Sequence, residues 1–344
     1  MLAPSQHNRL LRLPTMLALA FMLPMFWACS KQEQALGHAS LYYWRTTFHP
    51  TAAERAEIDT LSMLYLHLFD VVPAADEPVV GMLPDATLQF NDSSLLWLQE
   101  RTRRGLKVTP VVFLSPGIIT RHDTPKAKTL ARLLLSRMDE MMHQNGLPVA
   151  QEVQIDYDWT RTNQAAYFAF LQELADTLHE AQRQLSTTIR LHQLSMKAPP
   201  ADRGILMCYN TGRLTDPNEQ NSILTKQSVE PYVRQLDSYE LPLVLALPRF
   251  SLNAVFHNGA FAFIAPGLAL SDTTRFQRID ANHWRSVAYQ SVPQRVSATT
   301  QANVRIYPGD VVRRDESSDS LNALVARVLI RHRAELNNEI IIYP

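Results

Sequence analysis

The sequence predicts an α/β protein built on a (β/α)8 TIM barrel. From residue 39 onward, strand-like runs alternate with segments whose apolar residues recur at helical spacing, which is typical of a parallel sheet with crossover helices. Eight strand-like runs are present, the number that closes such a barrel. An open doubly wound sheet is the alternative, and the absence of a glycine-rich phosphate loop disfavours its nucleotide-binding forms.

Each predicted strand is a short apolar or alternating run. The strands cover residues 41–45, 63–71, 107–114, 152–159, 187–196, 205–210, 241–249 and 339–343, and the predicted helices cover 51–61, 93–104, 126–144, 163–185, 228–239 and 319–336. Thr51 and Glu54 have the spacing of a capping box at the first helix, and Ser93 or Ser94 is expected to cap the second. Pro199 and Pro200 exclude a long helix after the fifth strand.

Residues 251–317 interrupt this alternation with several β-rich pieces. We therefore expect a small β-rich subdomain inserted after the seventh strand, within a barrel domain of residues 39–344. Its aromatic residues Phe261, Phe263 and Trp284 either face a ligand or form the core of the insertion, and the second role is favoured.

The N-terminus has the pattern of a targeting segment. Arg9 and Arg12 precede an apolar run that is short for a transmembrane helix, and the run ends in Trp27-Ala28-Cys29-Ser30. A small residue before a cysteine at this point resembles a bacterial lipobox. The resemblance implies a signal peptide (1–28), lipidation at Cys29, a tether (29–38) and a bacterial cell-envelope protein anchored in the outer membrane. The alternative is an uncleaved anchor or an ordinary signal peptide.

Composition narrows the class of partner. The 344 residues include 33 basic and 33 acidic side chains, and no basic stripe is present, which argues against a nucleic-acid partner. Cys208 lies in an apolar run and is expected to be a small buried side chain. No Cys/His cluster with zinc spacing is found, and no cofactor is predicted. The oligomeric state is left open.

The fourth predicted strand, residues 152–159, carries the strongest sign of a functional site. Val153, Ile155 and Tyr157 alternate with polar residues, which places Asp156 and Asp158 on one face of the strand. Two carboxylates so close repel each other, and such pairs are tolerated where a ligand, proton or metal resolves the conflict. The alternative is structural, with one aspartate capping the next helix and the other solvated.

In a TIM barrel the active site lies at the carboxyl ends of the strands. The residues expected there combine aromatic rings, carboxylates and amides, which suits a carbohydrate because rings stack on sugars while polar groups bind hydroxyls. They are Trp44, Arg45, His67, Asp70, Ser115, Asp156, Asp158, Trp159, His192, Gln193, Tyr209, Asn210 and Arg249. Asp156 and Asp158 are the candidate catalytic residues. The candidates for substrate binding are Trp44, Arg45, His67, Asp70, Trp159, Gln193, Tyr209, Asn210 and Arg249.

Two motifs resemble those of family-18 glycoside hydrolases, the chitinase-like barrels. The run Ile155-Asp156-Tyr157-Asp158-Trp159 looks like the core of their D-x-x-D-x-D-x-E motif, and Met207-Cys208-Tyr209-Asn210 is similar to their M-x-Y-D motif. The first motif with its aromatic-rich following helix also resembles a group of bacterial barrel proteins, DUF3142. These resemblances imply a barrel that acts on or binds a glycan.

The sequence departs from the family pattern at the catalytic position. Thr160 stands where the family has its glutamate, Val153 replaces the first aspartate, and Asn210 replaces the acid after the tyrosine. A threonine hydroxyl cannot act as a general acid near neutral pH. Three functions therefore remain: a glycosidase that uses Asp158 with a second carboxylate such as Asp70 or Glu152, an inactive glycan-binding barrel, and a structural or assembly lipoprotein.

Several of these residues have a structural alternative. His67 and His192 are as compatible with hydrogen-bonded structural roles as with catalysis, and Trp159 with packing at the start of a helix. Arg45 and Arg249 either bind substrate or neutralise the aspartates. A Mg²⁺ or Ca²⁺ ion held by Asp156, Asp158 and Asp70 is the mechanistic rival to metal-free chemistry, and a nearby arginine would oppose it.

Overall fold

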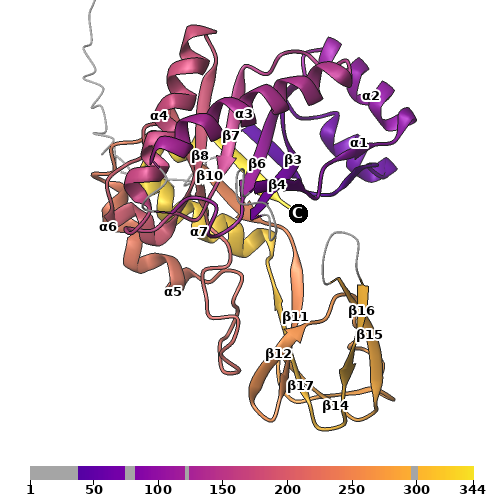
Figure 1. Ribbon diagram of the computed structural model, residues 1–344. Coiled ribbons are helices and arrows are strands. Elements are labelled where there is room, and N and C mark those ends of the chain that lie inside the picture. Colours follow the sequence, from indigo (N-terminus) through magenta and orange to yellow (C-terminus); the bar gives the residue numbers. More distant parts are fainter. Residues whose placement is uncertain (1–37, 74–81, 121–123, 296–300) are drawn as a thin grey trace, which may run out of the picture. The chain divides into compact units, whose positions relative to one another are not determined.

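The computed structural model describes residues 38–73, 82–120, 124–295 and 301–344 (Figure 1). All of these residues belong to one compact unit, Leu36–Pro344, and only this unit is considered below. The predicted signal peptide, the lipidation residue Cys29 and the tether up to residue 37 lie outside the described residues. Within the described ranges no helix combines the length and the apolarity needed to cross a membrane.

Eight parallel strands close into a barrel. Each pairs with the next along the chain, and the first pairs with both the second and the last, so the ring has no open edge. The strands are β1 (His38–Tyr43), β3 (Met63–Pro73), β6 (Lys107–Leu114), β7 (Glu152–Asp156), β8 (Gln184–Arg190), β9 (Arg203–Met207), β10 (Leu243–Pro248) and β18 (Glu339–Tyr343). The predicted TIM barrel is confirmed, and the alternative of an open sheet is wrong.

Short strands extend the mouth of the barrel on one side. β4 (Met82–Asp85) pairs antiparallel with the end of β3, so that Asp85 lies opposite Asp70. β2 (Thr47–Phe48) and β5 (Gln89–Phe90) form a separate small parallel pair.

Helices cover the outer face of the barrel (Figure 1). They are α1 (Ala52–Ile58), α2 (Asp92–Arg103), α3 (Thr124–Gln144), α4 (Gln164–Glu180), α5 (Lys226–Val229), α6 (Val233–Leu236) and α7 (Asp319–His332). Thr51 and Glu54 form the expected capping box at α1. At α2 the cap is Asn91, whose side-chain oxygen accepts from the Ser94 N–H at 3.3 Å, and neither predicted serine takes this role.

Several predicted elements end earlier or are divided, and three of them affect the mouth. The strand predicted at 187–196 stops at Arg190, because Leu191–Ser195 forms a 3-10 helix, η1. The strand predicted at 152–159 stops at Asp156. The helix predicted at 228–239 is divided into α5, the 3-10 turn η2 (Glu230–Tyr232) and α6, and Pro231 within η2 lacks the N–H that a continuous helix needs.

The apolar core lies largely between the barrel and its helices. Val153 and Ile155 of β7 are fully buried in the same cluster as Tyr167, Phe170 and Leu174 of α4. Burying each large apolar side chain contributes about 1.5–3 kcal/mol, so the outward residues of the strands hold the helices in place. Cys208 is also fully buried, as predicted.

The interior of the barrel is polar. Tyr42 on β1 and Gln154 on β7 lie on strands that are not neighbours, yet the Gln154 amide lies 2.6 Å from the Tyr42 hydroxyl, so the contact crosses the interior. At the start of the strands Arg203 bridges Glu152 at 2.5 Å and Glu339 at 2.8 Å. Buried polar groups are thus paired with one another, as their desolvation requires.

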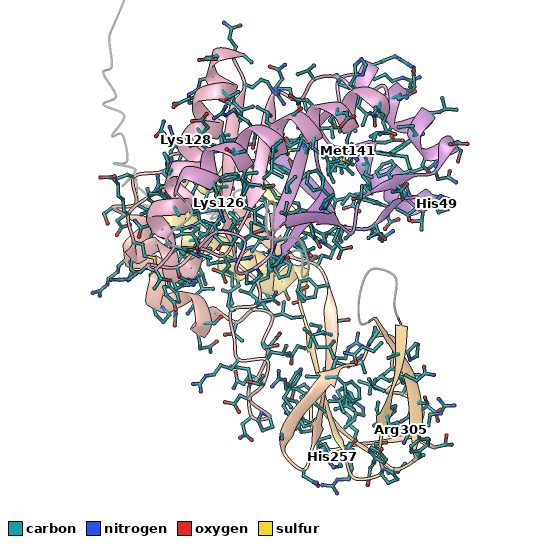
Figure 2. The ribbon with its side chains drawn as sticks, in the orientation of Figure 1. His49, Lys126, Lys128, Met141, His257 and Arg305 are labelled. Carbon is teal, nitrogen blue, oxygen red and sulfur yellow. The ribbon has the colours of Figure 1, made fainter. Side chains whose placement is uncertain are left out.

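The insertion after β10 is a β-rich subdomain, as predicted. Its five-stranded antiparallel sheet contains β11 (Ser251–His257), β12 (Ala260–Ile264), β13 (Phe276–Arg278), β14 (His283–Ser286) and β17 (Val311–Glu316), and β15 (Gln290–Arg295) pairs with β16 (Gln301–Ile306). Phe263 and Trp284 pack against its buried residues, which confirms the expected core role for these two. Figure 2 shows His257 and Arg305 in this subdomain, whereas Lys126, Lys128 and Met141 lie on α3.

Candidate functional site

Asp156 ends β7 inside the mouth of the barrel and is held by two neighbours. Its Oδ1 accepts from the Thr188 hydroxyl at 2.7 Å and from the Arg190 guanidinium at 3.3 Å, and both partners come from the adjacent strand β8. The Asp156 side chain is only 7% exposed. Asp156 is therefore a buried carboxylate with a positive partner and a hydroxyl donor.

Asp158 lies two residues after Asp156, beyond the end of β7, and is open to solvent. Its side chain is 54% exposed and lies 3.9 Å from His192 Nε2. The Gln193 amide donates to Asp158 at 3.3 Å and to the Trp159 carbonyl at 2.8 Å, and the Gln193 oxygen accepts from the Arg190 N–H at 2.7 Å. Gln193 thus fixes the loop after β7 against the end of β8, and it presents Asp158 to the mouth.

A cavity of about 290 Å³ opens beside Asp158 at the ends of β7, β8 and β9. We call it the first cavity. Its walls combine a carboxylate, a guanidinium, an amide and aromatic rings, and they are formed by Asp158, Arg190, Leu191, His192, Met207, Tyr209, Asn210, Thr211 and Tyr232. Pockets of this composition can hold a polar ligand by both stacking and hydrogen bonds.

A second cavity, of about 250 Å³, lies across the mouth at the ends of β1 and β3. Its walls are Trp44, Arg45, Thr46, His67, Asp70, Asp85 and Ala86. His67 Nε2 is 2.7 Å from Asp70 Oδ1, and the His67 side chain is 3% exposed whereas that of Asp70 is 26% exposed. The two predicted residues His67 and Asp70 therefore form a pair with only the carboxylate open to solvent.

A row of four aromatic rings joins the two cavities. Tyr209 of the first cavity stacks on Tyr343 with ring centroids 4.7 Å apart, and Tyr343 packs against Trp44 at 5.8 Å. Trp44 in turn stacks on His67 of the second cavity at 4.5 Å. We call this set, Tyr209, Tyr343, Trp44 and His67, the aromatic row. Tyr209 and His67 are buried, whereas Trp44 and Tyr343 are partly exposed, so the row offers aromatic surface at its two central rings, between two pockets that carry the polar groups.

The electrostatic environment keeps the tyrosines of the mouth neutral. Burial, and then the nearby Asp156 charge, raises the pKa of Tyr343 to about 12. Burial is also the main reason that the pKa values of Tyr42 and Tyr209 lie well above the usual value. For Arg190, burial lowers the pKa, but Asp156 and, to a smaller extent, Tyr209, Asp158 and Tyr42 together outweigh it, so the net pKa is raised.

The loop that carries Asn210 and Thr211 is fastened to the inserted subdomain. Arg313 on β17 donates to the carbonyl groups of Leu214 and Asp216. Asp315 accepts from the Ser222 N–H at 3.1 Å and from the Ser222 hydroxyl at 2.5 Å. Arg313 and Asp315 also pair with each other, and both side chains are fully buried. The insertion thereby supports one wall of the first cavity.

Three predicted binding residues are placed differently from expectation. Trp159 is fully buried against Tyr167 and Phe168, so it has no exposed face for a sugar ring, and the packing alternative describes it. Arg45 turns to Glu54 on α1, although it still lines the second cavity. Arg249 pairs with Glu57 at 2.5 Å, also on α1. Neither arginine forms an ion pair with Asp156 or Asp158, so the alternative that Arg45 and Arg249 neutralise these aspartates is wrong.

Two further expectations concern the second carboxylate and a metal. Glu152 begins β7 whereas Asp156 ends it, so Glu152 lies about 13 Å from the mouth and is bound to Arg203. Glu152 is therefore wrong as a partner for Asp158. The described residues contain no group of three or more His, Cys, Asp or Glu side chains that could hold a metal ion, and Arg190 occupies the place beside Asp156 that a cation would take.

Sequence reasoning overlooked Arg190 and Tyr343. Arg190 was placed inside a strand that was expected to continue to residue 196, so it was not recognised as a strand end. Arg190 is two residues after Thr188, so the two side chains lie on the same face of the strand. The sequence did not reveal that the strand ends at Arg190. Tyr343 ends the correctly predicted last strand, and treating that strand end like the other seven would have identified it.

Known proteins resemble this chain in fold and not in sequence. No protein-family model matches the sequence, and no curated protein matches it. Catalytic domain 2 of a Group II chitinase from Ostrinia furnacalis, solved in complex with (NAG)5, matches with a TM-score of 0.51 at 10% identity over 89% of each chain. The spore cortex-lytic enzymes SleL of Bacillus cereus and Bacillus megaterium each match with a TM-score of 0.50 over 89% of this chain and 70% of theirs, at 14% and 13% identity. These comparisons therefore show a shared TIM-barrel fold.

Proposed function

We propose that the barrel binds a carbohydrate at its mouth. The observation that carries this proposal is the aromatic row, because its rings continue from one polar cavity to the other. A sugar chain presents apolar ring faces and hydroxyl edges, and it needs this alternation of aromatic and polar surface. The likeness to chitinase and cortex-lytic barrels supports the same class of ligand by analogy of fold.

The proposal is tested by titrating the full chain, in a detergent without a sugar headgroup, with chitin, peptidoglycan, N-glycan and plant-type oligosaccharides. At least one should raise the melting temperature. Trp44→Ala should weaken its binding about tenfold, since a stacked ring contributes on the order of 1 kcal/mol or more. Tyr289→Ala is the matched control, because Tyr289 is 54% exposed on the inserted subdomain. No shift with any glycan, or equal losses in both variants, would contradict binding at the aromatic row.

Hydrolysis is the second candidate function, and Asp158 is the observation that favours it. Asp158 lines the first cavity, is open to solvent, and has His192 3.9 Å away and the Gln193 amide at 3.3 Å. In this proposal Asp158 acts as the general acid or orients a substrate amide, while Asp156 stabilises positive charge that develops on the sugar. Asp70 lines the other cavity and is a candidate for the second carboxylate.

The enzyme proposal is tested by mass spectrometry of products after incubation with the same oligosaccharides. Asp158→Asn should abolish product release and leave the melting temperature unchanged, because the exposed carboxylate has no basic partner except His192 among the described residues. A thermal shift without products in the unmodified protein would leave binding as the sole function. Unchanged product release in Asp158→Asn would remove Asp158 from the mechanism.

We further propose that the protein is a lipid-anchored component of the bacterial cell envelope, sorted to the outer membrane. The support is the lipobox-like run that ends at Cys29, and the resemblance to the DUF3142 group remains part of this proposal. Cys29→Ala should abolish labelling with a fatty-acid analogue and release the protein from the membrane fraction. Membrane retention without labelling would favour the uncleaved anchor instead.

A further inference from the structure

The arginines of the mouth are already neutralised. Arg190 pairs with Asp156 at 3.3 Å, and Arg249 pairs with Glu57 at 2.5 Å. Arg45 pairs with Glu54 through both of its terminal nitrogens. Each positive charge thus has a carboxylate of its own, and none is left to attract an acidic ligand.

Three aspartates that line the cavities have no such partner. Asp70 and Asp85 lie in the second cavity and Asp158 in the first. Among the described residues, neither lysine nor arginine forms an ion pair with any of them, and their basic contacts are limited to His67 for Asp70 and His192 for Asp158. The walls of the two cavities therefore carry an excess of negative charge.

The second cavity concentrates this charge. Asp70 and Asp85 are direct partners in the antiparallel pairing of β3 and β4, which sets the two carboxylates side by side on the cavity wall. Trp44 provides an aromatic wall of the same cavity. A cation in this position would neutralise the two carboxylates and contact the ring face.

His67 in the same cavity has a ring nitrogen that is not satisfied. Its Nε2 is 2.7 Å from Asp70 Oδ1, whereas Nδ1 has no hydrogen-bond partner among the described residues, although the side chain is only 3% exposed. A buried polar atom without a partner is costly, so this wall of the second cavity has unused hydrogen-bonding capacity.

We propose that the preferred ligand is a glycan with free amino groups, a partly or fully deacetylated hexosamine chain, whose ammonium group binds in the second cavity between Asp70 and Asp85. This inference rests on the proposed glycan-binding function and specifies its ligand. An N-acetyl group is neutral and gains nothing from the two carboxylates, and a uronic acid is repelled by them. The aromatic row contacts the sugar rings between the two cavities whether the amino groups are free or acetylated.

The test compares tetramers of glucosamine, N-acetylglucosamine and galacturonate by calorimetry on the full chain in a detergent without a sugar headgroup. The glucosamine tetramer should bind on the order of tenfold more tightly than the acetylated one, and 0.5 M salt should remove most of this difference. Asp70→Asn and Asp85→Asn should each weaken glucosamine binding severalfold and leave binding of the acetylated tetramer unchanged. Glu140→Gln on α3 makes the same change of charge on the outer surface and should alter neither.

The outcomes separate this inference from the proposed function. Equal or tighter binding of the acetylated tetramer would overturn the amine preference and leave glycan binding intact. No binding of any tetramer or of the wider glycan panel would overturn both. A parallel titration with CaCl2 alone should give no thermal shift, and a shift lost in Asp85→Asn would assign the two carboxylates to a metal ion instead.

Discussion

Replacement of Arg313 by methionine tests how the insertion supports the mouth. Arg313 and Asp315 on β17 form a bidentate ion pair with both contacts at 2.8 Å and no exposed side-chain surface. The same guanidinium donates to two carbonyl groups of the loop between β9 and α5 and lies over the Phe256 ring at 5.4 Å. Arg313→Met keeps the packing over the ring and removes every one of these hydrogen bonds.

The expected cost follows from burial. Removing one partner of a buried ion pair leaves the other charge uncompensated and typically costs about 3–5 kcal/mol. Here Asp315 keeps its two hydrogen bonds from Ser222, whereas the two loop carbonyls lose a donor, so about 3–4 kcal/mol is expected. The double variant Arg313→Met/Asp315→Leu leaves no buried charge, and its cost should fall short of the sum of the single costs by about 1–3 kcal/mol.

Urea unfolding of the two single variants and the double variant measures this coupling, and hydrogen exchange shows where the structure opens. The amide groups of residues 211–225 should lose protection in Arg313→Met before those of the barrel strands do. Because this loop carries Asn210 and Thr211 into the first cavity, glycan binding should weaken as well. Additive costs in the double variant, or unchanged protection of the loop, would refute the role assigned to the pair.

Three further predictions concern the barrel itself. Gly204→Ala on β9 should destabilise the fold by about 1–3 kcal/mol in urea unfolding, because the new Cβ would lie 2.7 Å from the Ile189 side chain and 2.9 Å from that of Leu241. Tyr343 has a folded-state pKa of about 12, above its usual 10.0, so its contribution to stability is complete below pH 10 and is lost as the pH rises towards 12. In alkaline unfolding curves Tyr343→Phe should lose less stability over this range than the unmodified protein, while the loss due to Tyr42 and Tyr209 remains. Burial raises the pKa of the Cys208 thiol, so in a Cys29→Ala background a thiol reagent should react only after unfolding.

The barrel could be predicted from sequence because its signals are local and repeated. Each outward strand face is a run of buried apolar residues, and each long helix has an apolar face that matches it, as in β7 and α4. The errors occurred where a side chain overrides the pattern. The Gln193 side chain closes η1 immediately after β8, and no periodicity reveals that contact between Gln193 and Arg190.

The candidate site was predictable in its location but not in its pairings. The carboxyl ends of the strands mark the mouth of a barrel, so Asp158, His67 and Tyr209 could be placed there from the sequence. In the structure these residues line the two cavities. Which arginine meets which carboxylate depends on distances between elements far apart in the chain. Arg249 therefore reaches Glu57, 192 residues away, and Arg190 takes the place beside Asp156.

The Asp156–Arg190 pair bears directly on the proposal of hydrolysis, because Thr160 stands where the motif that this sequence resembles has its glutamate. A general acid on this strand would need a carboxyl group that is free to reach the glycosidic oxygen, yet Asp156 is engaged by a guanidinium at 3.3 Å and a hydroxyl at 2.7 Å. Thr160 itself is exposed and bonded to Thr162 and Asn163 at the start of α4. Thr160 thus cannot supply the acid of the motif that this sequence resembles, and Asp156 is held in an ion pair with Arg190. The aromatic row and both cavities are nevertheless present. This combination favours a mouth built to hold a glycan, with Asp158 as the one carboxylate of the motif that is still free to act on it.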